Sequence, residues 1–131
     1  ITHSSDWLPT FAELAGAGTQ NVSGKSLVAL LTGSVEQVRD SNETVGREIW
    51  GKRGIIANGY KLVSSGKPNE LVDWELYNLQ ADPGEQIDLA QRQPEVFNSM
   101  LKHWNDYVAN NNVILPEGPF TVRPVGKKPV E

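Results

Sequence analysis

The stretch RGIIANGYKLVS, residues 53–64, decides the fold of this chain. Asn58-Gly59 separates two short runs, residues 53–57 and 60–64, which carry β-branched, aromatic and other apolar side chains. A type I′ turn needs positive φ at both central residues, and Asn-Gly meets this requirement with little strain. The stretch therefore predicts a tight β-hairpin in the middle of the chain.

One further strand is predicted on each side of this hairpin. The strand before the hairpin is predicted at residues 45–50. After the hairpin, residues 65–70, with Gly66 and Pro68, are predicted to form a turn or loop. Residues 74–79 alternate between two faces, one with Trp74, Leu76 and Asn78 and the other with Glu75, Tyr77 and Leu79. The four strands together predict an antiparallel meander.

A long helix is predicted to follow the sheet. Pro94 suits its first turn, where the missing N–H costs nothing, and residues 110–112, all Asn, end it. The segment must bury its apolar stripe, and the sheet is the obvious partner. The stripe comprises Phe97, Leu101, Trp104 and Val108, with Met100 and Tyr107 beside it. Residues 114–131 contain four prolines and predict an extended tail.

Two helices are predicted before the sheet. Residues 6–15 have apolar side chains at helical spacing, with Asp6 as N-cap and Pro9 in the first turn. Residues 26–31 form a short apolar helix closed by Gly33, and the polar residues 34–44 are expected to be exposed. The predicted fold class is therefore α+β.

Composition excludes several classes of function. The chain of 131 residues carries a net charge of −4 and no block of Lys or Arg, so nothing points to nucleic acid or an anionic membrane. No apolar run approaches the roughly 20 residues of a membrane span. There is no cysteine, which excludes disulfides and a Cys nucleophile within these residues. The chain begins at Ile1 and not at Met, as expected of a fragment or a processed chain.

The two histidines, His3 and His103, are the first candidates for chemistry. His103 lies off the apolar stripe of the long helix and is expected to be solvated. His3 is close to Ser4, Ser5 and Asp6, but neighbours in one short segment rarely form a catalytic triad. Helix capping by Asp6 and a loop role for Ser4 and Ser5 explain this cluster better.

Metal and sugar sites have weaker candidates. Asp82, Glu85 and Asp88 are the best acidic group, but the turn Asp-Pro-Gly-Glu needs such residues for backbone reasons alone. The chain has four tryptophans, Trp7, Trp50, Trp74 and Trp104. Their expected role is core packing, and the alternative is a platform on which a sugar stacks. The residues by themselves indicate a folded domain without catalytic machinery.

Three segments, taken in order, resemble the C-terminal end of type I sulfatases, especially bacterial arylsulfatases. The first is DWLPTFAELAG over residues 6–16, followed by GKSL at 24–27 and LLTG at 30–33. The second is GYKLV at 59–63. The third is ELYNLQADPGE at 75–85, followed by DLA at 88–90. Asn78 and Asp88 replace the family's commoner Asp and Asn.

The resemblance implies a particular place in a larger fold. In that family, which is related to alkaline phosphatase, a small four-stranded antiparallel sheet with a terminal helix packs beside a large α/β domain. Residues 1–40 would be the helical end of the large domain, residues 41–115 the sheet-and-helix subdomain, and residues 116–131 the extended tail. The large N-terminal catalytic domain of the same polypeptide would be the partner.

The resemblance also implies a sulfuric ester hydrolase that uses calcium and a formylglycine nucleophile. The nucleophile motif, Cys/Ser-x-Pro-x-Arg, is absent from these residues, so no catalytic or metal residue is carried over. This chain alone is expected to be inactive. His3 is expected at the rim of the substrate cleft, and a bacterial sulfatase would be periplasmic or secreted. The alternatives are a piece of a related phosphonate or phosphodiester hydrolase, or a free-standing, non-catalytic binding module.

Overall fold

The computed structural model describes residues 1–49, 51–65 and 74–115. Trp50, most of the predicted loop over residues 65–70, and the proline-rich tail from residue 116 lie outside the described residues. The chain divides into two compact units, Ile1–Val45 and Gly46–Glu131. Each unit is considered separately below.

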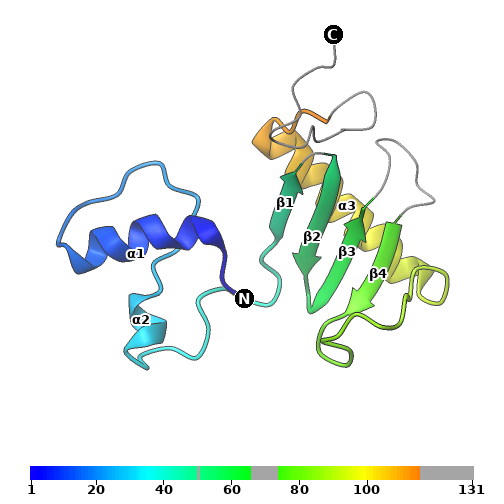
Figure 1. Ribbon diagram of the computed structural model, residues 1–131, viewed down its shortest axis with the longest axis horizontal. Helices are drawn as coiled ribbons and strands as arrows, with labels where there is room; N and C mark the ends of the chain where they lie inside the picture. The colour runs from blue at the N-terminus through cyan, green and yellow to red at the C-terminus, as the bar shows by residue number, and fades with distance from the viewer. Residues whose placement is uncertain (50, 66–73, 116–131) are drawn as a thin grey trace, which may run out of the picture. The chain divides into compact units, whose positions relative to one another are not determined.

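The second unit contains the predicted four-stranded antiparallel sheet, and the α+β class is confirmed. Its strands are β1 (Val45–Ile49), β2 (Lys52–Ala57), β3 (Tyr60–Ser64) and β4 (Trp74–Asn78), in the order β1-β2-β3-β4 (Figure 1). The strand ends agree with the sequence prediction to within one residue. Consecutive strands are neighbours because short connections favour antiparallel hairpins.

The turn between β2 and β3 has the predicted geometry. Asn58 has φ 53° and Gly59 has φ 78°, so both central residues lie in the left-handed region. The turn sets the register, in which Ala57 pairs with Tyr60 and Arg53 pairs with Ser64. This register directs Ile55 and Leu62, which pair with each other, into the core, where both are fully buried.

The long helix α3 (Pro94–Asn111) lies across one face of the sheet and contacts β2 and β3 (Figure 1). Asn112 ends it with φ 49°, a left-handed conformation that Asn tolerates. Trp104 packs against Trp74 with ring centroids 5.6 Å apart. The core comprises Ile55, Ala57, Leu62, Trp74, Leu76, Met100 and Trp104.

The buried line of α3 differs from the predicted stripe. Met100 was placed beside the stripe, but it is only 2% exposed, whereas Phe97, Leu101 and Val108 are only partly buried. Met100 and Trp104 are four residues apart and therefore lie on one side of the helix. This side of the helix packs against the sheet, in one cluster with Ile55, Leu62 and Leu76.

The first strand is held to α3 by a close contact between a glycine and an aromatic ring. A Cβ at Gly46 would overlap the ring of Tyr107, so only glycine fits this position. The Tyr107 hydroxyl donates a hydrogen bond of 2.9 Å to the Glu48 carboxylate. Burial, followed by the bond to Glu48, raises the pKa of Tyr107 to about 12. Tyr107 thus belongs to the packing of this unit.

The first unit is helical, with a 3₁₀ turn, η1 (Ser4–Asp6), followed by α1 (Trp7–Leu14) and α2 (Val28–Leu31). Both predicted helices are present, although α2 has only four residues. Thr10 supports both helices, since its hydroxyl donates to the Asp6 carbonyl at 2.6 Å and accepts from the Leu27 N–H at 2.9 Å. Among the described residues, no helix is long and apolar enough to cross a membrane.

Candidate functional site

His3 begins the 3₁₀ turn and is half-buried. Its Nδ1 lies 2.9 Å from the Ser5 hydroxyl and also accepts the Ser5 N–H at 3.3 Å. The His3 N–H donates to the Asp6 carboxylate at 2.7 Å. These contacts make His3 the cap of the turn, whereas the sequence prediction gave the capping role in this cluster to Asp6. Both side-chain contacts involve Nδ1.

Asp6 has a different role from the predicted one. It occupies the N-cap position of α1, but its side chain makes no cap bond there. Instead, its buried carboxylate forms a two-pronged ion pair with Arg39, with N–O distances of 2.5 and 2.7 Å, and accepts the Lys25 N–H at 2.9 Å. The bond to Arg39 dominates and holds the pKa of Asp6 well below its usual range. Through Lys25 and Arg39, Asp6 connects the segments before and after α2 to the start of α1.

The acidic turn after β4 serves the backbone. Asp82 accepts the N–H groups of Gln86 and Ile87 at 2.7 and 2.9 Å. Asp88 accepts the Leu76 N–H at 3.0 Å and the Ala90 N–H at 2.8 Å, and so ties the turn to β4. The Glu85 carboxylate pairs with Lys61 at 2.5 Å. The three carboxylates therefore have separate partners, and within the described ranges no three His, Asp or Glu side chains converge as metal ligands would.

The tryptophans divide between core and surface. Trp74 and Trp104 are buried as predicted, and Trp50 lies outside the described residues. Trp7 contradicts the core prediction, because 58% of it is exposed. It stacks on Phe11, with centroids 5.6 Å apart, on a face of α1 that no described part of its own unit covers.

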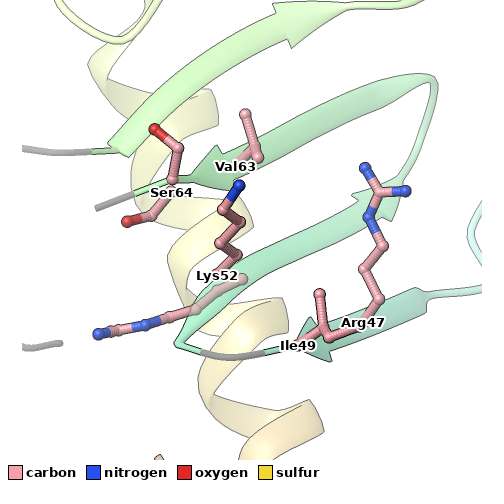
Figure 2. A pocket seen from close by; sticks show the side chains of 7 residues that line it. Arg47, Ile49, Lys52, Val63 and Ser64 are labelled. Carbon is pink, nitrogen blue, oxygen red and sulfur yellow. The ribbon is translucent and has the colours of Figure 1, made fainter. Parts of the chain in front are cut away.

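The sequence reasoning missed a hollow at one end of the sheet, which Figure 2 shows from close by. Its volume is about 190 Å³. The lining residues are Arg47, Ile49, Lys52, Arg53, Val63, Ser64 and Ser65. Three of these side chains are basic, yet they are spread over two strands and do not form a charge block in the sequence. Only the pairing of β1, β2 and β3 brings them together.

No family model matches this chain. It is 32% identical, over 89 residues, to an uncharacterized sulfatase of Schizosaccharomyces pombe, and the match covers 68% of this chain and 16% of that protein. Its fold is similar to that of a candidate sulfatase from Bacteroides thetaiotaomicron, with 24% identity, a TM-score of 0.63, and coverage of 82% of this chain and 24% of the other.

A solved structure described as a 2-O GAG sulfatase matches equally well, with 24% identity, a TM-score of 0.63, and coverage of 82% and 24% of the two chains. The chain thus spans about a quarter of the sulfatase structures it resembles and less of the curated relative. These matches agree with the sequence motifs and with the four-stranded sheet and its terminal helix. In sequence and in fold, this chain matches the C-terminal region of a sulfatase.

Proposed function

We propose that this chain is the C-terminal subdomain of a sulfuric ester hydrolase and that the catalytic residues lie in the rest of that polypeptide. The observation that carries the proposal is the 32% identity to a sulfatase over 89 residues, 16% of that protein's length. The matched relatives and structures are described as sulfatases, which favours this proposal over a phosphonate or phosphodiester hydrolase. The same descriptions favour the proposal over a free-standing binding module.

Residues 1–40 are proposed to be the helical end of the large domain, and residues 41–115 the subdomain that packs beside it. The exposed apolar face of α1 supports this division. Trp7, Leu8, Phe11 and Leu14 are each 58% to 65% exposed, and Leu31 of the short helix is 72% exposed. A contiguous apolar patch of this kind marks a surface that another part of the protein covers. The large catalytic domain is the partner that we propose for it.

Calcium and formylglycine would belong to the large domain. Calcium binds six to eight oxygen ligands, and the carboxylates of the Asp82 turn do not fit this requirement because backbone N–H groups and Lys61 already occupy them. Formylglycine is made from Cys or Ser in a motif that these 131 residues lack. The role of this chain is therefore to stabilise the catalytic domain and to form part of the cleft wall.

His3 is proposed to lie at the substrate rim. The support is its fixed orientation, because Ser5 and Asp6 hold the residue by its Nδ1 and its backbone. In the full-length enzyme, His3→Gln should raise KM with kcat nearly unchanged, as for a residue that contributes uniform binding. His103→Gln is the matched control, and equal effects of both variants would exclude a rim role for His3.

Hydrolysis assays test the proposal as a whole. The 131-residue chain, purified with calcium, should not hydrolyse a chromogenic sulfate ester. The full-length polypeptide should hydrolyse it, and should prefer it to the matching phosphodiester. Sulfate ester hydrolysis by the short chain, or a preference of the full-length protein for the phosphodiester, would overturn the proposal. The coding sequence before Ile1 should contain a Cys/Ser-x-Pro-x-Arg motif.

A further inference from the structure

We infer that Asn58 is a modification site, at which the side-chain amide is lost spontaneously to give aspartate and isoaspartate. Asn58 is exposed at the tip of the hairpin, between β2 and β3. Asparagine is among the thermally labile residues of proteins, and Asn58-Gly59 is the single Asn-Gly pair in the sequence. The pair that makes the turn is therefore also its chemically labile point.

The reaction needs water and no other reagent. The Gly59 backbone nitrogen loses its proton to solvent and attacks Cγ of Asn58, which forms an N–C bond and a cyclic imide. The side-chain amide nitrogen of Asn58 takes up a proton and leaves as ammonia. Water then opens the imide. Cleavage of the new bond at Cγ gives aspartate, whereas cleavage at the backbone carbonyl carbon gives isoaspartate, in which the chain runs through Cγ.

Both reacting groups are accessible. Glycine has no side chain that could shield its backbone nitrogen. Among the described residues, no hydrogen bond involves the Gly59 N–H or the side chain of Asn58. Asn21 and Asn112 are also exposed and left-handed, with φ 57° and 49°, but valine follows each of them. A β-branched side chain crowds the neighbouring backbone, so these two asparagines serve as internal controls.

The native turn holds the reacting atoms apart. Ring closure requires the Gly59 nitrogen to lie on the same side of the Cα–C bond of Asn58 as Cβ. In a type I′ turn the first central residue has a ψ of about +30°, which places that nitrogen nearly opposite Cβ. The φ values of 53° and 78° at Asn58 and Gly59 fit this turn. The reaction therefore proceeds from a locally opened hairpin tip, whose population sets the rate.

The segment after β4 keeps the tip closed. The Leu79 N–H donates to the Gly59 carbonyl at 2.9 Å. The Gln80 side chain lies against Gly59, since a Cβ at Gly59 would be 3.2 Å from Cδ of Gln80. Asn78 restrains this segment, because its Oδ1 accepts the N–H groups of Gln80 and Ala81 at 3.0 and 3.1 Å. Loss of the Gln80 contact should thus open the tip more often.

Isoaspartate would lengthen the turn by one backbone atom. The two-residue turn sets the pairing of Ala57 with Tyr60, and the same register places Ile55 opposite Leu62 in the core. Turn length fixes the register of a hairpin, so isoaspartate should destabilise the sheet. Aspartate adds the same negative charge but keeps the backbone. The variant Asn58→Asp therefore separates the effect of the charge from that of the backbone.

Peptide mapping by mass spectrometry tests this inference on the 131-residue chain, stored in neutral buffer at physiological temperature. Aspartate and isoaspartate should accumulate at residue 58 and not at Asn21 or Asn112. A synthetic peptide of residues 53–64 does not keep the turn closed, because an isolated hairpin is marginally stable, and it should convert severalfold faster. If residue 58 stays unmodified in the chain while the peptide converts, or if Asn112 converts equally fast, the inference is wrong.

Matched variants test the role of the segment after β4. Gln80→Ala should raise the rate of conversion at residue 58 about twofold, as expected for the loss of one exposed contact. Gln20→Ala, in an exposed loop of the first unit, is the control and should leave the rate unchanged. Equal rates in Gln80→Ala and the wild type would contradict a restraint by this contact.

Urea denaturation measures the consequence for the sheet. The isoaspartate fraction, separated chromatographically from the stored chain, should unfold at lower urea than Asn58→Asp. Equal midpoints would show that the additional backbone atom does not disturb the register, against the inferred consequence. None of these measurements depends on sulfate ester hydrolysis, so their outcome is separate from that of the catalytic proposal.

Discussion

At the scale of single residues, the Asp6–Arg39 pair is the most consequential interaction in the first unit. The Asp6 side chain is fully buried and that of Arg39 is 9% exposed, and their positions are 33 residues apart in the chain. Removing one member of a buried pair leaves the other charge without compensation, which costs about 3–5 kcal/mol. Asp6→Asn should therefore loosen the segment that carries Lys25 and Leu27, with faster amide hydrogen exchange at both residues.

The effect of pH follows from the same pair. Since Arg39 lowers the pKa of Asp6 in the folded state, this carboxylate stabilises the fold fully above its unfolded-state pKa of about 3.9. That contribution declines as the pH falls below this value. The protection of Lys25 and Leu27 should therefore decrease below about pH 4 in the wild type and change less in Asp6→Asn. Asp106→Asn, which removes an exposed ion pair with Lys102 on α3, is the control and should keep the wild-type profile. A wild-type profile in Asp6→Asn would contradict this assignment.

At the scale of elements, the sheet and α3 stabilise each other through the pair of tryptophans. Trp104 is 3% exposed and packs on Trp74. Trp104→Ala should lower the free energy of unfolding by about 3–5 kcal/mol, because it leaves a cavity in the core. Urea denaturation followed by circular dichroism measures this loss. Trp104→Phe keeps part of the packing and should lose less, and Lys102→Ala on the exposed side should stay within about 0.5 kcal/mol of the wild type.

The type and position of most helices and strands could be predicted from the sequence. The Asn58-Gly59 turn, the alternation in β4 and Pro94 at the start of α3 are local signals, so element type and position follow from them. The burial of Met100 could not be predicted, because helical spacing defines a stripe but not the side that faces the sheet. The shape of the sheet surface decides that, and it depends on residues far away in sequence.

At the scale of the whole molecule, the exposed face of α1 should make the chain self-associate. Trp7 and Phe11 stack on this face with more than half of each side chain exposed. Trp7→Ser combined with Phe11→Ser should reduce both self-association and the binding of a hydrophobic dye. Sedimentation velocity measures the first and dye fluorescence the second. Glu13→Ser, on the same helix, is the control and should leave both unchanged. If the double variant behaves like the wild type, this face is not the docking surface.

The sequence by itself determined the elements of this protein and its resemblance to the C-terminal end of sulfatases. Both depend on short segments, such as residues 59–63 and 75–85, whose turn chemistry and periodicity act over a few neighbours. Only the tertiary structure decided the partner of Asp6, the exposure of Trp7 and the hollow that Arg47, Lys52 and Arg53 line. These features depend on contacts between segments that are distant in the chain. Strand pairing and helix packing create such contacts, and no local pattern encodes them.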